Sequence, residues 1–325
     1  MAAHFSRIFI VIIISGVAHR TSAQAFFASG APTIPFLMHH HHRLSSSAAA
    51  ASTITDDSSG TSDESASSVP FRILCLHGKG GNGKEFLKKL QPLRTMVDDR
   101  LADANKSCGG ASIFKYIFKW DALTAPYQIS DTNAYAWWTM PPGVRSFNAD
   151  EYIGFDESAS MVLNAVFPHS TGCNYDLILG HSQGAILLSS LLATNFNMQR
   201  SECSYILNGV AWPNPFNNAL TLLSEQEVPE MNDTQMLFVM GRNDNINPIE
   251  SAKEVHDAYQ RAGLGVSIVY HNGGHSVPLG NGGDLDSKRA LEDICDFILR
   301  IAAGKAEKIN TIISPNEKEG NKCEE

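Results

Sequence analysis

The 325-residue chain lacks the patterns that mark metal centres and nucleic-acid binding. Its 6 cysteines form no C-x-x-C pair and no spacing typical of a zinc site, so we expect neither a metal nor another cofactor. The formal net charge is −9, and no basic cluster alternates with aromatic residues, which argues against a nucleic-acid partner. No internal repeat is evident. The sequence leaves the oligomeric state and the disulfide status of the cysteines open.

The chain also lacks an apolar run long enough to span a bilayer comfortably, which argues against stable membrane insertion. Residues 1–25 instead read as a signal peptide, because Arg7 precedes the apolar run 8–14 and small residues follow at 23–25. The segment 26–68 begins with two phenylalanines and is rich in Ser and Ala. This order resembles the bipartite presequences of complex plastids in diatoms and related algae. We expect a plastid location, with a secreted or endoplasmic-reticulum protein carrying a flexible linker as the alternative.

The rest of the chain reads as one folded domain followed by a tail. The sequence is 43% hydrophobic and 18% charged, which suffices for a sizeable core. Short apolar strands alternate with helical patterns through residues 69–304, and this alternation predicts an α/β fold: a mostly parallel sheet with helices on both faces. Residues 305–325 are charged and lack an apolar period, so we predict a disordered tail there.

The most informative stretch is Gly-His-Ser-Gln-Gly at 180–184, a G-x-S-x-G motif. An apolar, strand-like run precedes it and a helix-forming run follows it, which is the context of a nucleophile elbow. Small neighbours on either side leave space for a strained backbone at Ser182. We predict Ser182 as the catalytic nucleophile and the backbone N–H of Gln183, at the helix N-terminus, as an oxyanion donor. A chance match in a loop is the alternative.

A serine nucleophile needs a histidine base and a carboxylate that orients the base; in α/β-hydrolases the acid comes next along the chain and the histidine last. Asp244 follows the apolar run 235–241, in a loop closed by Pro248, and is the predicted acid. The alternative is a turn or helix-cap aspartate before the helix predicted at Ile249–Arg261.

The predicted base is His275, which lies after two glycines on a loop beyond the last apolar run, 266–270. His271 is the rival. It follows that run immediately, so its side chain is less free to reach over the sheet edge.

A second glycine-rich loop, 77–83, follows the first predicted strand, 71–76. A backbone N–H just after its His-Gly pair is where the second oxyanion donor is expected. We predict the N–H of Lys79, with Gly80 as the alternative, and a structural role for His77. The same loop nearly matches the phosphate-binding pattern G-x-x-x-x-G-K-[ST], which makes a nucleotide-binding protein the alternative of another class. Glu85 stands where that pattern needs Ser or Thr, and its carboxylate would repel phosphates.

Several motifs together resemble the FSH family of serine hydrolases. They are the His-Gly pair at 77–78, the run Ala-Trp-Trp at 136–138, the stretch 176–185, Gly-Arg-Asn-Asp at 241–244 and Gly-Gly-His-Ser-Val-Pro at 273–278. The resemblance covers about residues 69–300. It implies a compact α/β-hydrolase fold and esterase activity toward acyl esters, and it carries over Ser182, Asp244 and His275 as the triad. One departure is His181, where the family more often has Phe, and this puts substrate preference in doubt.

The segment 120–155 is rich in aromatic residues and interrupted by prolines. At the carboxyl edge of a parallel sheet such a loop suits an apolar acyl or alkyl group, so we predict a substrate pocket that includes Trp137, Trp138 and Tyr127. The alternative is that the rings fill the core. The short chain between Gly209 and Gln235 leaves no room for a large lid. We therefore expect a serine esterase acting on small-molecule esters, with an acyl thioesterase using the same triad as the alternative.

Overall fold

The computed structural model describes residues 69–107, 116–168, 172–225, 234–280 and 284–313. The predicted signal peptide 1–25, the predicted transit peptide or linker 26–68 and the end of the predicted tail, 314–325, lie outside the described residues. Among the described helices, none combines the length and the apolar character needed to cross a membrane.

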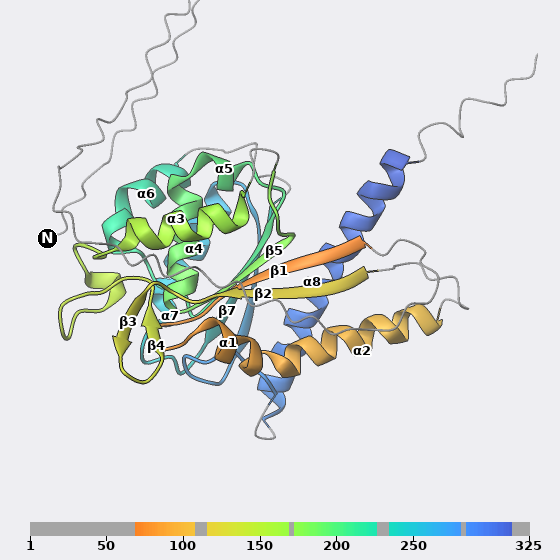
Figure 1. Ribbon diagram of the computed structural model, residues 1–325, viewed down its shortest axis with the longest axis horizontal. Helices are drawn as coiled ribbons and strands as arrows, with labels where there is room; N and C mark the ends of the chain where they lie inside the picture. The colour runs from red at the N-terminus through yellow and green to blue at the C-terminus, as the bar shows by residue number, and fades with distance from the viewer. Residues whose placement is uncertain (1–68, 108–115, 169–171, 226–233, 281–283, 314–325) are drawn as a thin grey trace, which may run out of the picture. The chain divides into compact units, whose positions relative to one another are not determined.

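The centre of the fold is a six-stranded sheet in the order β2-β1-β5-β6-β7-β8, with every neighbouring pair parallel (Figure 1). Most of its strand residues are buried, as expected of a parallel sheet that is covered on both faces. A separate antiparallel hairpin follows β2. The strands are β1 (Val69–Leu76), β2 (Tyr116–Leu123), β5 (Leu177–His181), β6 (Ser204–Asn208), β7 (Gln235–Gly241) and β8 (Gly265–His271), with the hairpin strands β3 (Tyr127–Ser130) and β4 (Ala134–Ala136).

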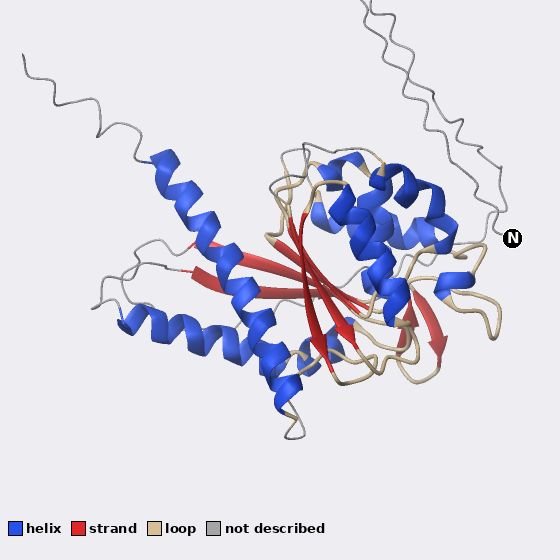
Figure 2. Ribbon diagram, turned by 180° about the vertical axis from the view of Figure 1, so that it is seen from behind, coloured by secondary structure: helices blue, strands red, loops and turns tan. Residues whose placement is uncertain are grey.

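Successive side chains along a strand point to opposite faces of the sheet, so each strand contributes apolar residues to two separate cores. Helices cover both of these faces. In β1, Ile73 and Cys75 belong to one core cluster, whereas Leu74 and Leu76 belong to the other. The first face packs against α1 (Gly83–Lys89), α2 (Gln91–Ser107) and α8 (Leu285–Ile313). The second packs against α3 (Phe155–Val166), α4 (Gln183–Thr194), α6 (Asn217–Ser224) and α7 (Ile249–Arg261), and Figure 2 shows both layers from behind. The remaining helical pieces are α5 (Phe196–Gln199) and the 3₁₀ turns at Ser146–Asn148 and Asn214–Phe216.

This arrangement is the predicted α/β-hydrolase architecture. Strand β7 and helix α7 have the predicted bounds, and the described chain between β6 and β7 carries only short helices. One prediction is wrong in part: the tail does not begin at Lys305, because α8 continues to Ile313. The extension is anchored, since Ala302 and Ala306 are buried and Lys305 pairs with Asp176 across the sheet end.

Candidate active site

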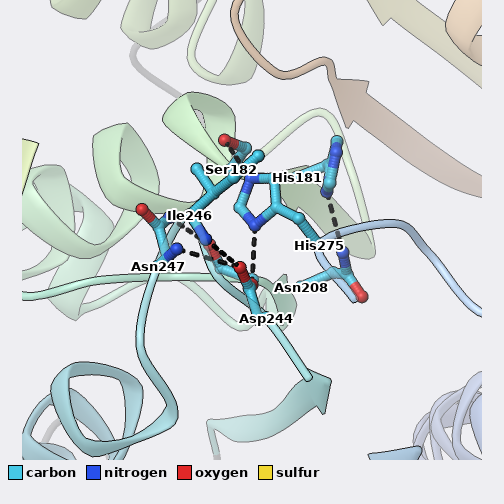
Figure 3. A network of polar contacts seen from close by, with 8 residues as sticks. His181, Ser182, Asn208, Asp244, Ile246, Asn247 and His275 are labelled. Atoms are coloured by element: carbon cyan, nitrogen blue, oxygen red, sulfur yellow. Dashed lines mark hydrogen bonds and ion pairs between the residues drawn. The ribbon is translucent and has the colours of Figure 1, made fainter. Parts of the chain in front are cut away.

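Ser182 lies at the junction of β5 and α4 in a strained backbone conformation, with φ 54° and ψ −118°. Non-glycine residues rarely adopt positive φ, and such strain persists only where the surrounding structure enforces it. Here the Ser182 N–H donates to Asn208 O at 2.9 Å, which ties the turn to the end of β6. The sharp turn places the serine at the carboxyl edge of the sheet (Figure 3).

The two glycines of the motif are required by close backbone approach. A Cβ atom on Gly180 would lie 2.7 Å from Ala185 Cα, and one on Gly184 would lie 2.4 Å from Leu76 O. Both contacts are backbone contacts that a side-chain rotation cannot relieve. The strand and the helix therefore pack together as closely as a nucleophile elbow needs.

Three side chains from separate loops form one hydrogen-bonded series (Figure 3). His275 Nε2 lies 2.7 Å from Ser182 Oγ, and His275 Nδ1 lies 2.6 Å from Asp244 Oδ2. An ionised carboxylate can only accept, so Nδ1 carries the proton and Nε2 is free to accept from the serine hydroxyl. The series contains the three residues that the sequence nominates, with His275 between Ser182 and Asp244 as the base requires.

Asp244 uses its two oxygens for different tasks. Oδ1 accepts from the backbone N–H groups of Ile246 at 2.8 Å and Asn247 at 2.9 Å, while Oδ2 faces His275. Burial alone would raise the pKa of Asp244, but the hydrogen bonds from His275 and these two amides outweigh it and lower the pKa. The turn aspartate and the acid that orients the imidazole are therefore one residue.

The rival histidine, His271, occupies the last position of β8 and is buried. Its carbonyl accepts from Arg242 N–H at 2.8 Å, and burial lowers the pKa of its imidazole. Within the described part of the chain its ring has no hydrogen bond to Ser182, whereas His275 has one.

The loop after β1 is organised by His77. Its Nε2 accepts from Ala125 N–H at 3.0 Å, so its Nδ1 must carry the proton and donates to Gly78 O at 2.7 Å. Burial lowers the pKa of His77 to about 4, which keeps this neutral form at ordinary pH. A Cβ on Gly78 would lie 3.0 Å from Ser182 Cβ, so the peptide that joins Gly78 to Lys79 runs beside the serine.

Some backbone N–H groups of this loop already donate a hydrogen bond within the protein, and one does not. Gly80 N–H donates to Tyr135 O at 2.8 Å, and Gly81 N–H donates to Gly78 O at 3.1 Å. Among the described residues no acceptor is seen for Lys79 N–H. Of the two donors that the sequence left open, Lys79 is thus the one whose amide remains available.

The same hydrogen bonds disfavour the phosphate-loop alternative. Phosphate cradles need several free backbone N–H groups. At the start of α1, Gly83 N–H donates to Thr124 Oγ1 at 3.0 Å and Glu85 N–H donates to Asn82 Oδ1 at 2.9 Å. Asn82 therefore caps the helix with its own side chain, and the N–H groups of Gly83 and Glu85 are not available to a phosphate.

Comparison with known proteins agrees with this geometry. Residues 67–282 match the sequence family described as "Serine hydrolase (FSH1)". The chain belongs to the FSH1 family of serine hydrolases. It is 27% identical over 230 residues to Esterase OVCA2 of Danio rerio, an alignment that covers 65% of this chain and 92% of the fish protein. This FSH1-family chain is thus a carboxylesterase-like hydrolase.

Solved structures with a similar course of the chain include two enzymes. A Bacillus cereus carboxylesterase superposes with a TM-score of 0.46 at 15% identity, covering 78% of this chain and 96% of the bacterial one. Acyl-protein thioesterase 2 of Zea mays superposes with a TM-score of 0.48 at 15% identity, covering 78% of this chain and 99% of the plant one.

His181, the departure from the usual FSH pattern, lies between two rings. It stacks on Phe86 with ring centroids 5.9 Å apart, and its centroid lies 5.2 Å from that of His275. Its Nδ1 is 2.7 Å from Asn208 Nδ2, so the amide donates and the imidazole carries its proton on Nε2. Burial, together with the nearby His275 and Lys89, lowers the pKa of His181 to about 3.

This low pKa predicts an acid-sensitive fold. In the unfolded chain the imidazole pKa is about 6.5, so between roughly pH 3 and pH 6.5 the unfolded state binds more protons and the free energy of unfolding falls as pH falls. From pH 7 to pH 5 the loss from His181 alone is about 2 kcal/mol. His181→Phe should remove this part of the loss while keeping the ring stack. Urea unfolding at both pH values tests it, and equal losses in the variant and the wild type would contradict it.

The predicted pocket residues are found elsewhere than expected. Trp137 and Trp138 are both 0% exposed, so they offer no surface to a substrate in this structure, and this prediction is wrong. Trp138 stacks on Tyr152 at 4.3 Å, inside the core beneath α3. Tyr127 is partly exposed, but its hydroxyl donates to Glu157 Oε2 at 2.6 Å and thereby holds the start of α3.

The sequence analysis misses two side-chain roles at the site, those of Gln183 and Asn208. The Gln183 side chain is buried; its Oε1 accepts from Trp137 N–H at 3.0 Å and its Nε2 donates to Trp138 O at 3.2 Å, which fixes the elbow to the segment after β4. Asn208, at the end of β6, holds both Ser182 N–H and His181. The only available signal was an Asn-Gly pair that ends an apolar run.

Proposed function

We propose that the chain hydrolyses carboxylic esters of apolar acyl or alkyl groups through an acyl-enzyme on Ser182. The observation that carries the proposal is the unbroken hydrogen-bonded series from Ser182 through His275 to Asp244. His275 takes the serine proton as Oγ attacks the ester carbonyl, and later returns it to the leaving alcohol. Asp244, with a lowered pKa, stays ionised and holds the imidazole in the required tautomer.

The attack of Oγ leaves a negative charge on the carbonyl oxygen of the ester. This oxyanion needs hydrogen-bond donors directed at it. The Gln183 N–H at the start of α4 and the Lys79 N–H beside Ser182 are proposed for this role. Backbone amides in fixed positions stabilise the charge without reorganising. Water then attacks the acyl-enzyme by the reverse sequence of proton transfers.

A fluorophosphonate probe and a graded panel of substrates test the proposal. We expect stoichiometric labelling of Ser182, located by peptide mapping, and hydrolysis of p-nitrophenyl esters that varies with acyl length. Acyl thioesters are included in the panel because the same triad cleaves both classes. Labelling without turnover of any ester or thioester would show a hydrolase-fold binder in place of an enzyme.

His77 offers a test of the oxyanion arrangement. His77→Asn keeps a donor near the position of Nδ1 and the bond to Gly78 O, whereas His77→Gln keeps an acceptor for Ala125 N–H but loses that donor. The hydrogen bond from His77 Nδ1 fixes Gly78 O, and thereby the peptide whose N–H belongs to Lys79. If this peptide must be fixed for its N–H to reach the oxyanion, His77→Gln should lower kcat by up to about 10²-fold with little change in KM. His77→Asn should lower it less. Steady-state kinetics on soluble protein decides, and equal losses in both variants would assign His77 a structural role only.

A further inference from the structure

The imidazole of His275 rests against Gly209, the residue that follows β6. A Cβ atom on Gly209 would lie 3.1 Å from His275 Cε1, 3.2 Å from His275 Nδ1 and 3.6 Å from Asp244 Oδ2. The Gly209 Cα therefore packs against the Cε1–Nδ1 edge of the ring. Its φ is 59°, a left-handed conformation that glycine adopts without strain. Glycine thus lets the end of β6 approach the hydrogen bond between the base and the acid.

Two hydrogen bonds hold Gly209 in this place. Its N–H donates to Val239 O at 3.0 Å, which ties it to β7. Its carbonyl accepts from Asn247 Nδ2 at 2.7 Å, and both of these residues are buried. The first bond joins two backbone groups and needs no particular side chain. The second depends on the amide of Asn247.

Asn247 also contacts the acid directly. Its backbone N–H donates to Asp244 Oδ1 at 2.9 Å, and Figure 3 shows it beside Asp244. Because Oδ1 accepts from this N–H and from that of Ile246, Oδ2 is the oxygen that faces His275. One residue therefore holds the acid through its main chain and Gly209 through its side chain.

The burial of this amide needs an explanation. Asn247 is 6% exposed, and a buried amide destabilises the fold unless it is hydrogen-bonded. In the sequence the residue looks like an ordinary turn asparagine before Pro248. A turn asparagine of that kind keeps its side chain in water, whereas this side chain reaches the end of β6. Its bond to Gly209 O is the contribution that a turn alone does not require.

We propose that Asn247 is a positioning residue for the catalytic base: by holding Gly209 O it fixes the surface against which His275 rests. The imidazole is thereby kept aligned with Asp244 at one nitrogen and with Ser182 at the other. The proposal rests on the esterase function proposed above. Without the amide, Gly209 O loses a buried partner, and the end of β6 is free to move off the ring. A displacement of about 1 Å in a reacting group lowers the rate by up to about 10²-fold.

Ser251 offers a matched control. Trp212 N–H donates to Ser251 Oγ at 2.7 Å, so this bond also joins the segment after β6 to the segment after β7. In the described part of the chain the Ser251 side chain has no hydrogen bond to the catalytic series. Ser251→Ala therefore removes a comparable link and leaves Gly209 held by Asn247.

The first measurement is kinetic. Asn247→Leu keeps the branched shape of the side chain and removes the donor. We expect its kcat on a p-nitrophenyl ester to fall by about 10- to 10²-fold with little change in KM, and fluorophosphonate labelling to slow in parallel. Asn247→Ser, with a shorter donor, should keep more of the rate and carries the test if the leucine variant does not fold. Ser251→Ala should stay close to the wild type. The end point of labelling counts the folded sites in every sample.

The second measurement reports the geometry without a substrate. The proton on His275 Nδ1 lies in a 2.6 Å hydrogen bond to a carboxylate, which deshields it. We expect its NMR resonance downfield of the amide region in the wild type and absent from His275→Ala. It should move upfield and broaden in Asn247→Leu, and stay in place in Ser251→Ala. Gly209→Ala, whose added methyl group would press on the ring, should displace it as well.

Three results would overturn the proposal. They are a folded Asn247→Leu with the wild-type kcat, a loss of kcat in Asn247→Leu without movement of the Nδ1 proton resonance, and a Ser251→Ala that loses rate and resonance to the same extent. Failure of the proposed function looks different. The wild type would then turn over no ester, while the resonance would still move in Asn247→Leu and not in Ser251→Ala.

Discussion

Replacing Ser182 by alanine is expected to lower kcat for ester hydrolysis by on the order of 10⁶-fold and to abolish fluorophosphonate labelling. The change removes the hydroxyl that lies 2.7 Å from His275 Nε2, so the nucleophile that would form the acyl-enzyme is lost. Initial rates on a p-nitrophenyl ester and intact-mass analysis after labelling measure both effects. Labelling of the variant at full stoichiometry would show that another residue is the nucleophile.

A second variant separates lost chemistry from a lost fold. Ser182 has φ 54°, which alanine tolerates no better than serine, so Ser182→Ala should melt near the wild-type temperature. Glycine adopts positive φ without this strain, which costs about 1–3 kcal/mol, and loses part of the gain through its greater chain entropy. Ser182→Gly should therefore be equally inactive but melt higher than Ser182→Ala. A lower melting temperature for the glycine variant would contradict the strain at the elbow.

The parts of this fold that the sequence predicts are those fixed by local patterns. Strand β7 and helix α7 are predicted with their observed bounds, because a continuous apolar run and a regular amphipathic period leave little choice. The elbow is equally local: two glycines, a serine and the flanking apolar runs lie within a short stretch. Chain order then narrows the other members of the hydrogen-bonded series to a few loop positions after later strands.

What the sequence could not predict depends on long-range packing. Aromatic content does not tell whether a ring faces a substrate or the core, and the indoles of Trp137 and Trp138 proved to be fully buried. Nor does it tell that Asn208 would meet Ser182 N–H, because that contact arises from the pairing of β5 with β6. The continuation of α8 past Lys305 likewise depends on a partner, Asp176, that is distant in the chain.

The second large effect is expected at His275. His275→Ala should lower kcat by about 10⁵–10⁶-fold, because Ser182 loses the acceptor of its proton and Asp244 loses the group that it orients. His271→Ala should leave kcat within about tenfold of the wild type, since His271 ends β8 without a hydrogen bond to Ser182 among the described residues. Both variants are assayed with the same p-nitrophenyl ester across the pH range in which the protein stays folded.

For the free energy of unfolding we expect the larger loss in His271→Ala and the smaller one in His275→Ala, the reverse of the expected losses in kcat. This separates a structural role of His271 from a catalytic role of His275. His271 is only 2% exposed, and truncating a buried ring leaves a cavity, so His271→Ala should lower the urea midpoint by an amount equivalent to about 2–4 kcal/mol. The His275 side chain lies at the site surface with 15% of its area exposed, and its loss should cost less stability. Active-site titration of His271→Ala with the fluorophosphonate corrects its rate for any unfolded fraction. If His271→Ala proved inactive when folded, while His275→Ala kept its rate, the base would be His271 and the hydrogen-bonded series through His275 would not be the path of the proton.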